Sequence, residues 1–224
     1  MTYCPLRKVR KESHGYFEEM NVPEKELYGS EKNPGLSCLD INSCHDNDGE
    51  YWVSSKQTSW NVTKVFCYMN SVKDANSVNL ALDKSANQSA TSTSWNASAG
   101  RAVDGNKNPH FYEGLSCTHT QYPVTDSPPW WRVDLQNVYF IRKLIITGRN
   151  DCCQDRLKDF EIRIGLSLDN NGNSNPTCGG NHSLTSNVVT KSITCPQPMI
   201  ERYVNIIIPE QNKILTLCEV EVYP

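Results

Sequence analysis

The sequence predicts an all-β fold in which antiparallel strands pack as a sandwich. From Asn79 onward, short apolar runs are separated by turn residues, which is typical of strands joined by tight connections. In the run DFEIRIG, apolar and polar residues alternate, so Phe160, Ile162 and Ile164 face one side of a strand. No long helical stripe competes with these runs, and two packed sheets bury strands that are apolar on one side.

The strands expected in this region follow one another at short intervals. They cover residues 130–135, 138–148, 159–165, 202–209 and 214–223. In the last one, Leu215 and Leu217 set one phase of alternation. Val220 and Val222 set the opposite phase, so the register slips between them. We expect a β-bulge at Cys218-Glu219, which turns backbone carbonyls out of the ladder, where a cation can use them.

The composition indicates an extracytoplasmic protein and argues against two classes of partner. The net charge is −3 and no basic stripe is interleaved with aromatic residues, so we expect no nucleic-acid partner. No run of about 18 apolar residues exists, so we expect no membrane insertion. Ten cysteines and four N-x-S/T sequons indicate a secreted, disulfide-bonded glycoprotein; the sequons are at Asn61, Asn87, Asn96 and Asn181.

Three segments differ in their patterns. Residues 1–32 are rich in charge and lack periodicity, which indicates a solvated linker or tail. No apolar h-region of a signal peptide follows Met1, so we expect a fragment, an incomplete gene product or one piece of a larger secreted protein. Residues 33–72 form a compact, cysteine-containing segment with a strand-like run at 65–69, and residues 77–224 form the β-domain.

The stretch RNDCCQDR places Cys152 and Cys153 side by side between Arg149 and Arg156. Neighbouring Cα atoms lie about 3.8 Å apart, which is less than the usual disulfide span of roughly 4.4 to 6.8 Å. The two cysteines therefore form either a strained ring closed on itself or two thiols with separate partners.

Residues from about 79 to 224 resemble the F-type lectins, the fucose-binding fucolectin family. The matching runs occur in the family's order: NLALDKSANQSATS, AVDGN, FYEGLSCTH, PWWRVDL, RNDCCQDR and LTLCEVEVY. The family's signature is a histidine, then Arg-x-Asp, four residues and a further Arg or Lys. In this chain it reads His119, Arg149-Asn150-Asp151 and Arg156. The resemblance implies a jelly-roll β-sandwich of the galactose-binding-like type that recognises terminal α-L-fucose.

The resemblance assigns the sugar contacts to His119, Arg149 and Arg156. Guanidinium groups are rigid, permanently charged donors that suit a ring oxygen and hydroxyls, and a histidine nitrogen donates or accepts according to its tautomer. A disulfide between Cys152 and Cys153 takes the place of a stacking aromatic ring. Asp151 pairs with and orients an arginine. Phe111 and Tyr112 are either an apolar wall for the sugar methyl or ordinary core aromatics.

The resemblance also implies two further disulfides and a structural calcium ion. The disulfides join Cys117 to Cys218 and Cys178 to Cys195. The oxygen donors suit a hard cation; they are the Arg101 carbonyl, Asp104, Asn106, Ser116, the Cys218 carbonyl and Glu219. This sequence departs from the family in two loops: the spacer from His119 to Arg149 is longer, and EGLSC holds one extra residue before Ser116.

Residues 33–70 resemble the opening of the fibrillar-collagen C-propeptide and, more loosely, fibrinogen-like domains. The runs NPGLSCLDINSCHDNDGEYWV and KVFCYM carry this resemblance, which implies a small β-module with Cys38 bonded to Cys67. Cys44 is left to bond Cys4 or another chain, with Cys4 preferred. His45 lacks the second CxxC or HxxxH spacing of a zinc site, so we do not expect a metal there.

The leading functional hypothesis is a secreted, non-catalytic lectin for fucosylated glycans, used in innate immune or cell recognition. Because one site binds a monosaccharide weakly, we expect multivalency, with a homo-oligomer as one route. The alternative is a matrix or adhesion protein that uses the sandwich as a scaffold without binding sugar. An enzyme with Cys152 or Cys153 as nucleophile and His119 as base is disfavoured, because the C-x-x-C spacing and an orienting group are absent.

Overall fold

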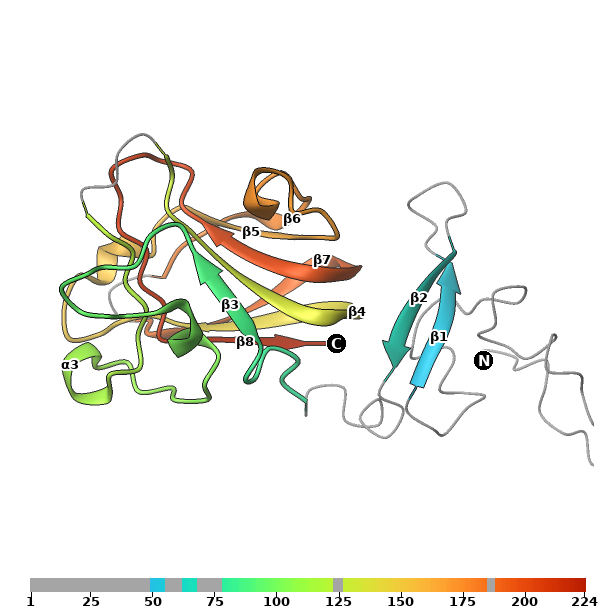
Figure 1. Ribbon diagram of the computed structural model, residues 1–224, viewed down its shortest axis with the longest axis horizontal. Helices are drawn as coiled ribbons and strands as arrows, with labels where there is room; N and C mark the ends of the chain where they lie inside the picture. Colours follow the sequence, from blue (N-terminus) through green and yellow to red (C-terminus); the bar gives the residue numbers. More distant parts are fainter. Residues whose placement is uncertain (1–48, 55–61, 68–77, 123–126, 185–187) are drawn as a thin grey trace, which may run out of the picture. The chain divides into compact units, whose positions relative to one another are not determined.

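The computed structural model describes residues 49–54, 62–67, 78–122, 127–184 and 188–224 (Figure 1). The chain divides into two compact units, Met1–Ala75 and Asn76–Pro224. In the first unit, β1 (Gly49–Ser54) pairs antiparallel with β2 (Val62–Cys67), with Gly49 opposite Cys67. The predictions for Cys4, Cys38, Cys44, His45 and Asn61 lie outside the described residues, and so does the partner of Cys67.

The second unit is built on antiparallel strands, which confirms the all-β prediction. The strands are β3 (Ser85–Gln88), β4 (Trp130–Thr147), β5 (Phe160–Gly165), β6 (Thr177–His182), β7 (Thr190–Ile207) and β8 (Glu219–Tyr223). Their order is β3-β4-β7-β5-β6, and β8 pairs with β4. Short helical turns connect them: η2 (Ala99–Ala102), α3 (Phe111–Gly114), η3 (Gln154–Arg156) and η4 (Asp169–Gly172). No helix in these described ranges is long and apolar enough to cross a membrane.

Two long strands, β4 and β7, run through the middle of the unit (Figure 1). The first part of β4 pairs with β3 and with residues 203–207 of β7, whereas residues 143–147 pair with β8 and with residues 190–194. Register shifts between these parts let both strands bend, because a shift locally breaks the ladder. One continuous pair of strands therefore serves both layers of the sandwich.

The observed strands correct several predicted ones. The runs 130–135 and 138–148 are one strand, β4, with an irregular pairing between Asp134 and Tyr139. The run 202–209 is the end of β7, which begins at Thr190 and ends at Ile207. β6 was not predicted, because its sequence TCGGNH shows no alternation of apolar residues.

The bulge predicted at Cys218-Glu219 is wrong. β8 begins only at Glu219, and its pairing with β4 has no register shift. The preceding residues bond to a different partner: Thr118 N donates to Leu217 O at 2.7 Å, and the Cys218 N–H then donates to Thr147 O at 2.8 Å. The change of phase between Leu217 and Val220 thus marks the point where the chain stops bonding to the segment around Thr118 and starts pairing with β4.

The core lies between the layers and anchors the turn η2. Phe160, Ile162 and Ile164 are fully buried, as the alternation predicts, and so is Trp131. Each such side chain stabilises the fold by about 1.5–3 kcal/mol relative to an exposed one. The Trp131 indole N–H donates to Ala99 O at 2.9 Å, which ties η2 to the core. The end of β4, the start of β8 and the loop that holds α3 meet at one end of the unit (Figure 1).

Candidate functional site

Arg149 follows the end of β4 and is held by a carboxylate two residues away. Its Nε and Nη2 donate to Asp151 Oδ1 at 2.6 Å and Oδ2 at 2.8 Å. Asp151 Oδ1 also accepts the backbone N–H of Phe111 at 3.2 Å. The hydrogen bonds from Arg149 lower the pKa of Asp151 to about 2, against the opposing effect of burial. Asp151 therefore stays ionised. Its carboxylate accepts from two of the five N–H groups of the Arg149 guanidinium, and Arg149 is only 7% exposed.

Two aromatic rings contact this arginine, and a third ring packs against those two. The Phe111 ring centroid is 4.3 Å from Arg149 Cζ, and the Tyr112 centroid is 5.0 Å from it. The Trp95 ring lies edge-on to both, at 5.9 Å from Phe111 and 5.4 Å from Tyr112. Phe111 is 2% exposed, whereas Tyr112 is 56% and Trp95 is 46% exposed. Phe111 is thus a core residue beneath the guanidinium, and we call Trp95 and Tyr112 the aromatic rim.

His119 joins this cluster through Phe111, with the two rings edge-on and their centroids 5.9 Å apart. Its Nδ1 lies 2.7 Å from Thr120 O, which only accepts, so Nδ1 carries the proton in the neutral ring. Nε2 then has a free lone pair that accepts from Arg156 Nη1 at 3.1 Å. Burial lowers the pKa of His119, and the charges of Arg156 and Arg149 lower it further, while the bond to Thr120 opposes them. The ring is therefore neutral at physiological pH.

Cys152 and Cys153 are bonded to each other, with their Cα atoms 3.8 Å apart. Cys153 has the left-handed φ of 59°, and its carbonyl accepts the N–H of Arg156 at 3.1 Å, which starts the turn η3. Both cysteines are partly exposed. Because no thiolate exists in this state, the enzyme hypothesis loses its nucleophile.

A shallow hollow, partly open to solvent, adjoins Cys153 of the disulfide. Its polar lining comes from Arg149, Gln154 and Arg156. Its apolar lining comes from Leu157, Leu184, Val188 and Val189. No carboxylate in the described part of the chain pairs with Arg156, whose pKa is lowered by burial and by the charge of Arg149. The cluster thus offers guanidinium donors and one neutral nitrogen beside an apolar surface.

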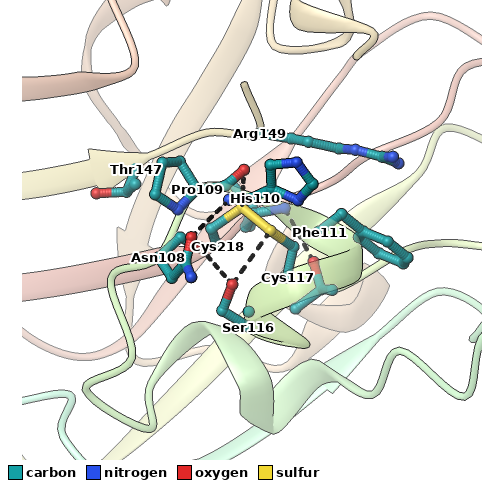
Figure 2. Close-up of a disulfide and its surroundings, with 12 residues drawn as sticks. Asn108, Pro109, His110, Phe111, Ser116, Cys117, Thr147, Arg149 and Cys218 are labelled. Atoms are coloured by element: carbon teal, nitrogen blue, oxygen red, sulfur yellow. Dashed lines mark hydrogen bonds between the residues drawn. A yellow bond between two sulfur atoms is a disulfide. The ribbon is translucent and has the colours of Figure 1, made fainter. Parts of the chain in front are cut away.

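A second disulfide, between Cys117 and Cys218, packs in the core next to Phe111 (Figure 2). Cys117 and Cys218 are fully buried and form a core cluster with Ala97 and Phe111. Figure 2 shows the Phe111 and Arg149 side chains near this disulfide, and the Ser116 hydroxyl donating to the Asn108 carbonyl. The disulfide therefore joins the loop that carries α3 to the start of β8.

The loop between η2 and α3 is organised by its own side chains. Asp104 Oδ1 accepts the N–H of Asn106 at 2.9 Å, and Asn106 Oδ1 accepts that of Asn108 at 3.2 Å. Asn108 Oδ1 in turn accepts the N–H of His110 at 2.9 Å. Gly105 has a φ of +80°, which disfavours other residues. This chain of turns holds the loop against the start of β8.

Glu219 faces this loop with its carboxyl group. It is fully buried, and neither oxygen forms a hydrogen bond within the described residues. Burial raises its pKa to about 8, with further contributions from Asp104 and Glu221, and the nearby Gly105 amide offsets only part of the shift. By contrast, Glu221 accepts from Lys107 Nζ at 2.7 Å and from the Tyr223 hydroxyl at 2.6 Å. A buried carboxylate without a partner is costly unless a cation compensates it.

The residues predicted to hold calcium supply oxygen donors from η2, from this loop and from residues at the start of β8. Arg101 lies in η2, Asp104 and Asn106 lie in the exposed loop, and Ser116, Cys218 and Glu219 are buried. They offer carboxylate, amide, hydroxyl and carbonyl oxygens, which suit Ca²⁺. The described ranges contain no group of three His, Cys, Asp or Glu side chains suited to a metal. The predicted calcium set would not form such a group, because only two of its ligands, Asp104 and Glu219, are carboxylates. The orphaned carboxylate of Glu219 is the observation that favours a cation.

The other predicted residues are placed as follows. Cys178 and Cys195 are bonded and lie on β6 and β7. Asn87, Asn96 and Asn181 are exposed. Leu115, one of the residues in the enlarged EGLSC loop, is exposed and takes the left-handed φ of 48° at the end of α3. Trp95 was missed, since nothing in the run STSWNAS separates a rim residue from a core aromatic.

Comparisons with known proteins identify the family. The family described as NedA-like, galactose-binding domain matches residues 101–206. Fucolectin-4 of Anguilla japonica is 46% identical over 147 residues, which are 64% of this chain and 78% of that protein. The fucolectin of Anguilla anguilla is 44% identical over 147 residues, 64% of this chain and 89% of that protein. The chain belongs to the fucolectin family.

Solved structures agree with this assignment. An F-lectin (fucolectin) from the serum of Morone saxatilis, the striped bass, superposes with a TM-score of 0.59 at 42% identity, covering 66% of this chain and 47% of that one. A fucose-binding module of Streptococcus pneumoniae gives a TM-score of 0.54 at 35% identity, covering 66% and 98%. The predicted resemblance and the β-sandwich are confirmed. Fucolectins are lectins, so the prediction that this chain is not an enzyme is also confirmed.

Proposed function

We propose that this fucolectin-family protein binds terminal α-L-fucose through His119, Arg149, Arg156 and the Cys152–Cys153 disulfide. The observation that carries the proposal is the arrangement of the two arginines. Asp151 accepts two hydrogen bonds from Arg149, and Arg156 donates to the neutral ring of His119. A deoxysugar supplies hydroxyl and ring oxygens that accept from the guanidinium N–H groups not engaged by Asp151 or His119. Relatives named fucolectins and fucose-binding modules support this choice of sugar.

The apolar parts of the site suit the rest of the sugar. The partly exposed disulfide presents sulfur atoms beside Arg156, where a ring face can pack. Tyr112, in contact with Arg149 and more than half exposed, is the candidate wall for the methyl group. Phe111 supports that wall from the core and has no exposed face of its own. Fucose therefore meets donors on one side and apolar groups on the other.

The proposed setting is extracellular, with fucosylated glycans of microbes or of the host as partners in innate immune or cell recognition. Three described sequons are exposed, and three disulfides hold the unit together. One solved relative comes from serum. A single site for a monosaccharide binds weakly, so we also propose that the protein is multivalent, as a homo-oligomer or in tandem with other modules.

Calcium is proposed as a structural ion held by Arg101, Asp104, Asn106, Ser116, Cys218 and Glu219. It would supply positive charge to the Glu219 carboxylate and tie the loop of α3 to β8. The chain's own residues do the sugar binding: Asp151 orients Arg149, and Thr120 holds the tautomer of His119.

Retention on fucose–agarose tests the proposal against the matrix-scaffold alternative. The full chain should be retained and should elute with free L-fucose, and Arg149→Ala and Arg156→Ala should abolish retention because each removes a donor fork. Arg142→Ala is the matched control, since Arg142 is exposed on β4 and contacts Phe140. Circular dichroism checks that each variant is folded. A folded wild-type chain that flows through would favour the scaffold.

A further inference from the structure

One sequon lies beside the candidate site. Asn96 directly follows Trp95, a member of the aromatic rim, so their Cα atoms are about 3.8 Å apart. Ala97, the next residue, is fully buried and packs in the cluster with Phe111. The Ala97 carbonyl accepts the backbone N–H of His119 at 3.1 Å. Asn96 thus sits between a residue of the rim and a residue that supports the ligand histidine.

The local backbone presents the Asn96 side chain to solvent. Asn96 has the left-handed φ of 45°, which asparagine tolerates well, and its N–H donates to Ser92 O at 3.1 Å. Its side chain is exposed and forms no hydrogen bond with the described residues. Ser98, which completes the sequon, is also exposed, and its side chain does not cap η2. An oligosaccharide on Asn96 would displace no contact of the fold.

The other described sequons occupy different places. Asn87 lies on β3 and Asn181 on β6, the two ends of the strand order β3-β4-β7-β5-β6. Asn181 pairs with Glu161 on β5. Neither residue adjoins the aromatic rim in sequence, so a glycan on Asn96 would differ from the others in its consequence.

We propose that Asn96 carries an N-linked glycan that stands at the aromatic rim and limits which fucosylated ligands reach the site. This inference rests on the proposed function. An N-linked glycan is bulky and hydrated, so it competes for space with the portion of a ligand that extends past the terminal fucose. Free fucose and fucose on a slender chain enter, whereas fucose on a branched glycan meets the attached sugar. Selectivity then comes from repulsion of the wrong ligand.

The test uses the full chain secreted from a glycosylating eukaryotic cell behind a supplied leader peptide. Peptide mass spectrometry after enzymatic deglycosylation in ¹⁸O water reports the occupancy of Asn96. Ser98→Ala and Asn96→Gln each remove the sequon by a different change, and Asn181→Gln is the matched control. Calorimetry then gives the affinity for free L-fucose and for a biantennary fucose-terminated oligosaccharide.

We expect Asn96 to be occupied, and both variants to bind the branched oligosaccharide at least about fivefold more tightly than the wild type, a typical coupling between two sites. Their affinity for free fucose and the behaviour of Asn181→Gln should not change. An unmodified Asn96 in the secreted protein overturns the inference, and so does an unchanged ratio of branched to free affinity in both variants. If wild type and variants fail to bind even free fucose, the proposed function fails first and this inference falls with it.

Discussion

Arg149 and Glu219 are both buried ionisable residues at the same end of the unit, but among the described residues only Arg149 has a partner. The Asp151 carboxylate receives two of its hydrogen bonds, whereas both oxygens of Glu219 lack a donor in the part of the chain described. The proposed sugar-binding region is therefore organised by contacts among the described residues. For the Glu219 region we propose calcium as the missing partner. The comparison teaches that two charged clusters joined by one disulfide can respond differently to calcium in the solution. We expect the Arg149 cluster to keep its contacts without calcium and the Glu219 cluster to be stabilised by it.

The largest effect is expected at the disulfide that joins the two regions. Cys117 and Cys218 are 101 residues apart in sequence, so replacing both by alanine should lower the free energy of unfolding by about 4–5 kcal/mol in the chain-entropy account. The pair Cys152 and Cys153 closes the smallest possible loop, so replacing both by serine should change stability far less and weaken fucose binding instead. Chemical denaturation and fucose calorimetry measure both quantities. Equal losses of stability from the two pairs would contradict the account.

The next effect concerns the internal partner of Arg149. Asp151→Ala should cost about 3 kcal/mol of folding stability, because removing one member of a buried pair leaves the other charge uncompensated. Fucose binding should fall as well, since the guanidinium loses its orientation. Asp155→Ala is the control, because that neighbouring carboxylate is exposed. If Asp151→Ala folds with wild-type stability and affinity, the pair does not organise the site.

The third prediction concerns the unpaired carboxylate. Wild-type protein should gain about 2.7 kcal/mol of stability at free calcium about 100-fold above Kd. Glu219→Gln should lose this gain while matching the wild type in chelator, because a carboxyl with a pKa of about 8 is mostly protonated near pH 7 and the amide resembles that neutral form. Glu113→Gln, on the exposed face of α3, serves as control. Thermal unfolding with calcium and with chelator measures each gain, and an undiminished gain in Glu219→Gln would place the ion elsewhere.

The smallest effect is the pH dependence of sugar binding. The pKa of His119 is lowered, so the ring is neutral above about 6.5 and charges only at lower pH. Protonation removes the Nε2 lone pair and puts a cation beside Arg156, so affinity should be flat from pH 8 to 6.5 and then fall by at most about tenfold per pH unit. Asp151, with a pKa of about 2, stays charged throughout.

Protonation of His119 also affects folding: the stability of the folded chain, like the affinity for fucose, decreases as the pH falls. A histidine whose pKa is lower in the folded chain binds more protons when unfolded, so its contribution to stability declines as pH falls from about 6.5 through the folded pKa. Calorimetric titrations between pH 4 and 8 on wild type and His119→Gln measure the binding effect. A variant that retains affinity and the wild-type pH profile would show that another group titrates.

The sequence predicted the family and the strands with clear alternation, and the structure brings the predicted residues Arg149, Asp151 and Arg156 close to His119 or to one another. The sequence missed the partner switch at Cys218, because alternation reports which side a residue faces and not which strand it pairs with. It also missed β6, whose glycines carry no periodic signal. The sequence predicted that Asp151 pairs with an arginine, and the structure shows that this arginine is Arg149. No local pattern indicated that Trp95 belongs to the rim, since that contact joins segments that are distant in sequence.

The central claim is that fucose binds at the preformed cluster of His119, Arg149 and Arg156. Long-range ¹H–¹⁵N spectra of the histidine rings, recorded during a titration with L-fucose, test it most directly. We predict that free His119 shows the neutral tautomer with the proton on Nδ1, and that its Nε2 resonance moves with fucose while that of His182 on β6 does not. Saturable fucose binding that leaves the His119 resonances unchanged would contradict the account.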